Sequence, residues 1–187
     1  MNKIVLKTII IATALVVLSC GKDKKEPVKS IPTQQEEIIA SDVDLNVTEA
    51  RSEVVFTDEI TGKIYSQYLN IKRGLVNSNY KVVQQEAKKL ENLIEESEGT
   101  KQLKATAKLI ALTKDVKKQR DFFVTLTEET AKLVSEADIT SGEVYKQYCP
   151  MAFKGEGGFW LSDSKEIRNP YYGDKMLQCG SVNQTIQ

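Results

Sequence analysis

The sequence has no histidine among its 187 residues. This absence excludes the side chain that titrates nearest to neutral pH, the pairing of a serine or cysteine nucleophile with histidine, and every zinc site that needs imidazole. A surplus of one charge is also absent, because 26 lysines and arginines balance 26 aspartates and glutamates. A neutral chain without a basic run lacks the electrostatic footprint of a nucleic-acid-binding protein. With no glycine-rich phosphate loop either, nothing in the sequence indicates an enzyme, and we expect no catalytic residues.

The start of the chain has the layout of a secretory signal that ends in a cysteine. Lysines give it a positive beginning, and residues 8–18 are an apolar run too short for a comfortable membrane span. The small Ser19 before Cys20 is similar to the cleavage site of bacterial lipoproteins, where the cysteine thiol carries diacylglycerol. We therefore expect a signal peptide at residues 1–19 and lipidation of Cys20. An ordinary cleaved signal and an uncleaved anchor remain alternatives. The lipidated chain would sit in the bacterial cell envelope, anchored to a membrane on its periplasmic or surface face.

Residues 20–55 are predicted to be the lipidated cysteine and a flexible tether. The stretch from 21 to 40 is charged, contains Pro27 and Pro32, and has too little apolar surface to order itself. Residues 41–55 alternate apolar and acidic positions, which leaves strand, helix and coil open for them.

Apolar residues recur at helical spacing in four successive stretches, each of which is apolar on one side only. Thr57, Thr100 and Asp115 are expected as N-caps of the first, third and fourth helices. Short polar connections make neighbouring helices antiparallel. The prediction is an all-α domain over residues 56–187: an up-down antiparallel four-helix bundle with an extended C-terminal tail of short strands and turns packed over it. The four expected helices span residues 57–76, 80–97, 101–113 and 115–137.

Sulfur-containing and aromatic side chains are concentrated in the tail after residue 142, which holds more than half of the aromatic residues and most of the sulfur atoms. Pro150 fixes the backbone between Cys149 and Met151, and in an extended run these two sulfurs would face the same side. Met176 and Cys179 are three residues apart, which is one turn on one face of a short helix. The tail therefore offers two pairs, each with one thiol and one thioether.

Two interpretations of these pairs stay open from spacing alone. Thiolate and thioether ligands suit Cu(I) or Ag(I), with metal binding driving thiol deprotonation. In a secreted domain, however, two cysteines most simply form a disulfide, here between Cys149 and Cys179. Closing this loop of about thirty residues would stabilise the fold by about 3–4 kcal/mol in the chain-entropy model. The methionines and aromatics would then pack the tail onto the helices.

A structural or protein-interaction lipoprotein is the matching alternative function. Its partner surface would come from the exposed aromatic pairs Phe159 with Trp160, or Tyr171 with Tyr172. An enzyme is a third interpretation, in which four charged residues of the tail would line a polar cleft. Because the chain has no histidine and no identifiable nucleophile, we expect these residues to be helix caps and ion pairs instead. These charged residues are Asp163, Glu166, Arg168 and Asp174.

Four stretches of the tail form one long motif: Tyr145-x-x-Tyr148-Cys149-Pro150-Met151-Ala152, Gly158-x-Trp160-Leu161-Ser162, Lys165-Glu166-Ile167-Arg168-Asn169-Pro170-Tyr171 and Gly173-Asp174-x-Met176-Leu177-x-Cys179-Gly180. With the helices before it, over about residues 56 to 187, this motif resembles a family of bacterial envelope domains, the domain of unknown function 3347. That family occurs as lone lipoproteins and as the C-terminal domain of some copper/silver efflux adaptor (membrane-fusion) proteins.

The resemblance implies metal ligands and a partner, but no catalytic role. The implied ligands are Cys149, Met151, Met176 and Cys179, and the implied partner is a heavy-metal efflux adaptor protein. Many family members have histidine where this chain has Tyr148, which removes one nitrogen ligand. The expected function is thus a membrane-tethered envelope lipoprotein that binds Cu(I) or Ag(I), with the disulfide-stapled interaction protein as the alternative.

Overall fold

A computed structural model describes residues 43–187 of the chain. The predicted signal peptide, the lipidation site Cys20 and most of the predicted tether lie outside the described residues. Within them, no helix combines the length and the apolar character needed to span a membrane.

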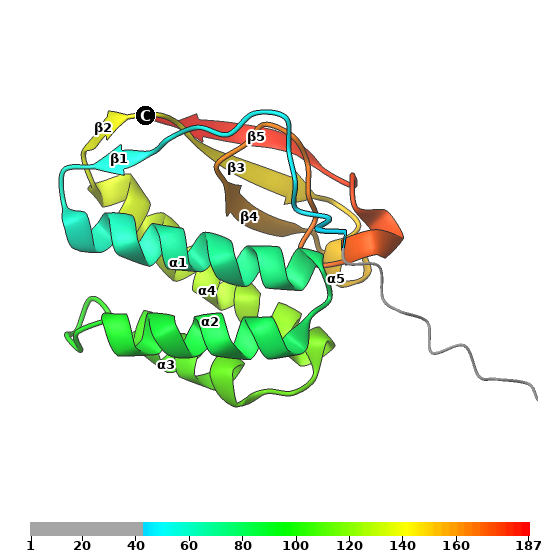
Figure 1. The fold of residues 1–187 in the computed structure, drawn as a ribbon, viewed down its shortest axis with the longest axis horizontal. Coiled ribbons are helices and arrows are strands. Elements are labelled where there is room, and N and C mark those ends of the chain that lie inside the picture. The colour runs from blue at the N-terminus through cyan, green and yellow to red at the C-terminus, as the bar shows by residue number, and fades with distance from the viewer. Residues whose placement is uncertain (1–42) are drawn as a thin grey trace, which may run out of the picture. The chain divides into compact units, whose positions relative to one another are not determined.

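Helices make up the first part of the described chain, and they lie where the apolar spacing predicts them. Each of them packs against the next along the chain, and the fourth also packs against the first (Figure 1). They are α1 (Glu59–Val76), α2 (Tyr80–Leu93), α3 (Lys101–Leu112) and α4 (Val116–Glu136). Their inward faces carry apolar stripes, whereas Ile60 of α1 and Leu109 and Leu112 of α3, which share the apolar helical spacing, are exposed.

Capping chemistry fixes where these helices begin. Asp115 caps α4 as predicted, since its carboxylate accepts the N–H of Lys117 at 2.8 Å. The cap of α1 is Asp58 rather than Thr57, because the longer carboxylate reaches two free N–H groups of the first turn. Thr100 makes no side-chain cap bond to α3; its hydroxyl donates back to the Glu95 carbonyl at 2.6 Å.

The tail pairs into a sheet, so the predicted all-α class is wrong and the fold is mixed. β3 (Val144–Cys149) lies between β4 (Gly158–Ser162) and β5 (Ser181–Ile186) in an antiparallel sheet of order β4-β3-β5. Extended segments were expected here, but β3 takes one of its two partners, β5, from a distant part of the sequence, which no local pattern reveals. The remaining elements are β1 (Val55–Phe56), β2 (Ile139–Ser141), the turn α5 (Ala152–Gly155) and the 3₁₀ turn η1 (Gly173–Met176).

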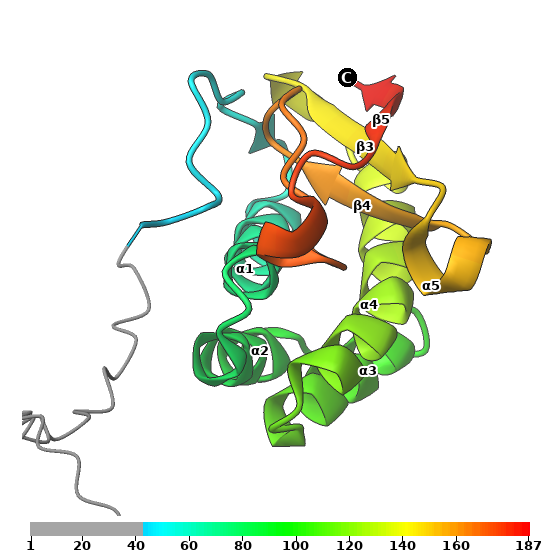
Figure 2. The same ribbon diagram turned by 90° about the vertical axis from the view of Figure 1, so that its right-hand side faces the viewer.

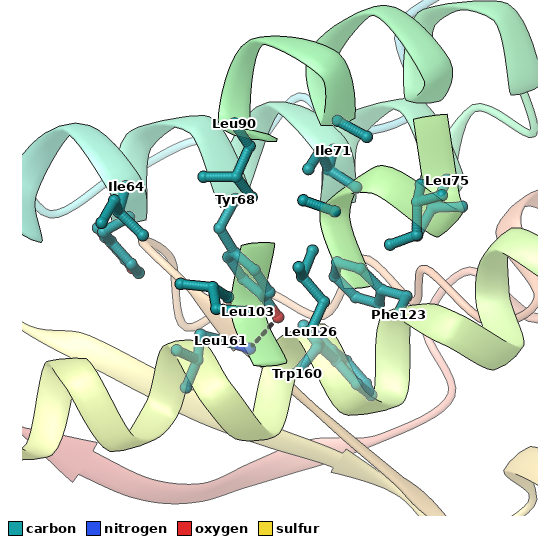
Figure 3. Packing of buried hydrophobic residues seen from close by; sticks show 14 of the residues in the cluster. Ile64, Tyr68, Ile71, Leu75, Leu90, Leu103, Phe123, Leu126, Trp160 and Leu161 are labelled. Carbon is teal, nitrogen blue, oxygen red and sulfur yellow. Dashed lines mark hydrogen bonds between the residues drawn. The ribbon is translucent and has the colours of Figure 1, made fainter. Parts of the chain in front are cut away.

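The sheet meets the helices through β4 (Figures 1 and 2). Trp160 and Leu161 of β4 are fully buried, and the Leu161 N–H donates to the Tyr68 hydroxyl of α1 at 2.9 Å, the dashed contact in Figure 3. The Tyr68 hydroxyl also lies 2.9 Å from the Thr127 hydroxyl of α4, and the Tyr68 ring stacks on the ring of Phe123. One tyrosine thus joins two helices to the strand.

A buried lysine lies beside this junction. Lys72 of α1 is only 2% exposed, and its ammonium donates to the Ser162 hydroxyl at 3.1 Å. Burial lowers the pKa of Lys72 from 10.5 to about 8; the charge of nearby Asp163 opposes this shift. An ammonium removed from water with a single hydroxyl partner costs stability at neutral pH.

Residues 43–55, which the sequence assigned to the flexible tether, contact the domain. Arg73 of α1 bonds Asp44 at 2.8 Å, and Arg51 bonds Asp163 at 3.1 Å. β1 then pairs with β2. This stretch belongs to the same compact unit as the helices and the sheet, so the folded part begins before residue 56.

Tyr68→Phe tests the junction between helices and sheet. The change leaves the buried Leu161 N–H without its acceptor, so the free energy of unfolding should fall by about 1–3 kcal/mol. Urea denaturation measures this, with Tyr80→Phe at the first residue of α2 as the control. Equal stability of the two variants would show that the Tyr68 hydroxyl does not secure β4.

Lys72→Met tests the cost of the buried ammonium. Ser162 keeps the Ser164 N–H as a partner at 3.2 Å, so we expect the variant to be more stable below pH 8, by up to about 3 kcal/mol. Because the folded-state pKa lies below the unfolded one, wild-type stability rises with pH between about 8 and 10.5, and the gap to the variant closes there. Lys81→Met on exposed α2 surface serves as the control, and a pH-independent gap would contradict the assignment.

Candidate functional site

The two cysteines of the tail come together in the structure. Cys149, the last residue of β3, is fully buried, whereas Cys179, between η1 and β5, is partly exposed. Both are free thiols. Burial, and then the hydrogen bond and charge of the Cys149 thiol, raise the pKa of Cys179 to about 11. The register pair Tyr148 and Ser181 likewise brings the two cysteines together, although their residues are far apart in sequence.

The sheet and an aromatic cluster hold Cys149 in place. Its strand partner is Gly158, and a methyl group at Gly158 would lie 2.7 Å from the ring of Tyr171. Tyr171 is buried edge-on against Trp160, and its hydroxyl donates to the carbonyl of Phe159. The Cys149 strand end is thus packed between β4 and β5 with aromatic rings nearby, and it has little freedom to move.

Cys179 is held by its backbone. Its N–H donates to the Met176 carbonyl at 3.0 Å, and its carbonyl accepts the side-chain amide of the fully buried Asn169 at 2.8 Å. The following Gly180 adopts φ +139°, and a methyl group there would lie 2.8 Å from both the Trp160 ring and the Tyr148 carbonyl. Only glycine allows the chain to pass this close to β3 and β4 on its way into β5.

Each predicted methionine has its backbone against Cys179. The Met151 N–H favours the thiolate of Cys179, since it lowers the pKa that burial raises, and the Met176 carbonyl accepts the Cys179 N–H. The Met151 carbonyl also accepts the Tyr172 hydroxyl at 2.6 Å. The four sulfur residues therefore share one corner of the tail, and their role as metal ligands stays a prediction.

The local geometry of the first pair differs from the expected extended run. Strand β3 ends at Cys149, and Pro150 begins a turn in which Met151 has helical dihedrals of −87° and −10°. Residues two apart in a turn do not share a side as they do in a strand. Consequently Cys149 is buried while the Met151 side chain is 53% exposed.

The predicted aromatic partner surface is mostly interior. Trp160 is fully buried and Tyr171 is 6% exposed, so neither is available to a partner; both fill the space between sheet and helices. Phe159 remains on the surface, with its ring tilted against that of Tyr148 at 4.5 Å between centroids, and Tyr172 is partly exposed.

Three of the four charged residues singled out in the tail form ion pairs as expected, whereas Asp174 lies in the first turn of η1. Asp163 pairs with Arg51, and Glu166 pairs with Arg168 at 3.1 Å. Across residues 43–187, no three side chains of histidine, cysteine, aspartate or glutamate gather in one place. The candidate site is therefore the corner of the tail shared by Cys149, Met151, Met176 and Cys179, called the sulfur corner below.

The sequence does not predict that Gly180 and Asn169 position Cys179. The sequence indicates Asn169-Pro170 as a turn and Gly180 as a helix stop. It holds no signal for the amide bond across to Cys179 or for the close passage beside Trp160, because both depend on tertiary packing.

Gly180→Ala tests whether this close passage brings the thiols together. Gly155→Ala is a matched control: Gly155 also has positive φ, at +98°, but its Cβ would meet no atom within 4 Å. Both variants bear backbone strain, and Gly180→Ala should lose about 1–3 kcal/mol more from overpacking, measured by urea denaturation. The pKa of Cys179 should also fall in Gly180→Ala as Cys149 moves away. Equal losses and an unchanged thiol titration would contradict this account.

Comparison with known proteins finds one family model that matches the helical part of the chain. Residues 64–142 match the family model described as "Protein of unknown function (DUF3347)", from Ile64 in α1 through the end of β2. The cysteine pair lies beyond the matched residues. No curated protein and no solved structure matches the chain. The chain thus carries a DUF3347 domain at residues 64–142.

Proposed function

We propose that the protein is a membrane-tethered envelope lipoprotein whose tail binds soft metal ions, Cu(I) or Ag(I), through Cys149 and Cys179, and that it exchanges the ion with a heavy-metal efflux adaptor. Met151 and Met176 are the auxiliary thioether ligands. The observation that carries the proposal is the convergence of two free thiols from distant segments, in a corner where both methionine backbones contact Cys179.

The chemistry of the donor set supports soft ions over hard ones. Thiolates and thioethers prefer Cu(I), whereas carboxylates and imidazole suit other metals. The chain has no histidine, and no cluster of three carboxylate or thiol groups exists among the described residues. A cation bound between two thiolates also stabilises their charged form.

The burial pattern supports exchange rather than permanent storage. Cys149 supplies a buried anchor with little water nearby, while Cys179 is partly exposed and the Met151 side chain is largely exposed. An ion held on the surface side is accessible to thiols and thioethers of a partner. The raised pKa of Cys179 means that binding at neutral pH displaces a proton, so apparent affinity rises with pH.

The second candidate is a structural or interaction lipoprotein, and the same proximity supports it. Oxidation of these two free thiols would form a Cys149–Cys179 disulfide. The bond would staple the end of β3 to the segment before β5. Phe159 and Tyr172 are the aromatic residues left for a partner surface.

Competition titration of the reduced protein tests metal binding. Cu(I) is partitioned between the protein and a chromophoric chelator, and the single tryptophan, Trp160, gives a fluorescence readout beside the site. The Cys149→Ser, Cys179→Ser double variant should lose at least about a hundredfold in affinity, because it loses both chelating thiolates. Met151→Leu with Met176→Leu should lose less.

Cys20→Ser is the matched control, because it removes the remaining cysteine of the chain and should leave the affinity unchanged. Wild-type affinity should also increase from pH 6 to pH 8. Unchanged affinity in the double variant would rule out the site, and fully oxidised cysteines in protein extracted from the envelope would favour the staple.

A further inference from the structure

We propose that the Cys149–Cys179 pair undergoes thiol–disulfide exchange with an accessible disulfide of another envelope protein, that the exchange enters at Cys179, and that closure of the pair expels the bound metal ion. The metal-release part rests on the proposed function. The exchange itself rests on the geometry of the two thiols.

Unequal exposure of the two sulfurs sets the entry point. Exchange requires the attacking thiolate to approach a disulfide in line with its S–S bond, so the attacking sulfur must reach the surface. Cys179 lies in the connection between η1 and β5 and is partly exposed. Cys149 is 0% exposed, on the central strand with β4 and β5 on its two sides. A partner disulfide therefore reaches Cys179 first.

Proximity makes Cys149 the resolving thiol. Tyr148 is the register partner of Ser181, and a methyl group at Gly180 would lie 2.8 Å from the Tyr148 carbonyl, so the segments that bear the two thiols lie side by side. Attack of the Cys149 thiolate on a mixed disulfide at Cys179 is therefore intramolecular. The backbones that bear both thiols are fixed, one by β3 and the other by the Asn169 amide and Gly180. Resolution consequently needs side-chain rotation rather than rearrangement of the chain.

The reaction balances without a further reagent. The Cys179 thiolate attacks one sulfur of the partner disulfide, forms a mixed disulfide, and the other partner sulfur leaves as a thiolate. The Cys149 thiolate then attacks Cys179 Sγ, forms the Cys149–Cys179 bond and releases the second partner thiolate. Two electrons pass from the pair to the partner, and the two protons of the pair end on the partner thiols. A bound ion loses both thiolates and leaves with its charge unchanged.

The same environment protects the pair against indiscriminate oxidation. Cys149 is fully buried and Cys179 is only partly exposed, so a disulfide can approach the pair through one of its two sulfurs. Metal binding replaces the proton and keeps both sulfurs occupied. Exchange with a partner disulfide is then a release step for the ion.

Trapping of the mixed disulfide tests this order of events. Reduced, metal-free protein carrying Cys20→Ser is incubated at pH 8 with oxidised glutathione as the probe disulfide, and adducts are followed by intact mass. Addition of Cys149→Ser should trap one glutathione on Cys179, whereas addition of Cys179→Ser should slow modification at least about tenfold. With both tail cysteines present, the adduct should resolve to an internal disulfide, seen as loss of two hydrogens.

Cys149→Ala is the second trapping variant, because alanine tolerates the buried position if serine disturbs folding. Faster modification of Cys149 than of Cys179, or a persistent adduct when both cysteines are present, would overturn the proposal. These arms contain no metal, so they can succeed while the Cu(I) titration fails. In a separate experiment with Ag(I)-loaded protein, formation of the internal disulfide should release one ion for each disulfide formed. Retention of the ion after disulfide formation would refute the proposed release of metal.

Discussion

The tail depends on the buried hydroxyl of Tyr68. It accepts the Leu161 N–H of β4 (Figure 3). It also lies beside the Thr127 hydroxyl, so one side chain from α1 ties α4 and the sheet together. A buried backbone N–H on a strand that borders helices has no ladder partner on that side, and leaving it unpaired is costly. A second buried side-chain hydrogen bond lies within the sheet, where the ring N–H of Trp160 donates to the side-chain oxygen of Gln147 of β3 at 2.6 Å. These contacts set the position of β4 and β3.

The sulfur corner follows from that placement. With β3 fixed, its last residue, Cys149, is buried at a defined point. The chain then continues through β4, the turn around Asn169 and η1, and it returns beside β3 where Gly180 permits a close approach to Trp160. Cys179 arrives next to Cys149 as a result. The helices that match the DUF3347 model act as the support on which the later tail is built, and the proposed chemistry belongs to the tail.

Local patterns predicted the helices well and the sheet poorly. The apolar spacing of residues such as Ile64, Tyr68 and Ile71 is a short-range signal, and all four helices lie where it places them. The strand β5 is polar and almost wholly exposed, so its pairing with β3 has no local signature. The four sulfur residues were identified by type and spacing. Their meeting point depends on Gly180 and Asn169, whose roles arise only from tertiary contacts, and the turn at Pro150 replaced the expected strand.

The central claim is that two distant cysteines form one sulfur site. X-ray absorption spectroscopy on the reduced, Cu(I)-loaded protein tests it most directly, because the spectrum reports the elements bonded to the ion. The account predicts a first shell of sulfur alone, lost in the Cys149→Ser, Cys179→Ser double variant and retained in Cys20→Ser. Nitrogen or oxygen ligands in the first shell, or the same spectrum in the double variant, would contradict it.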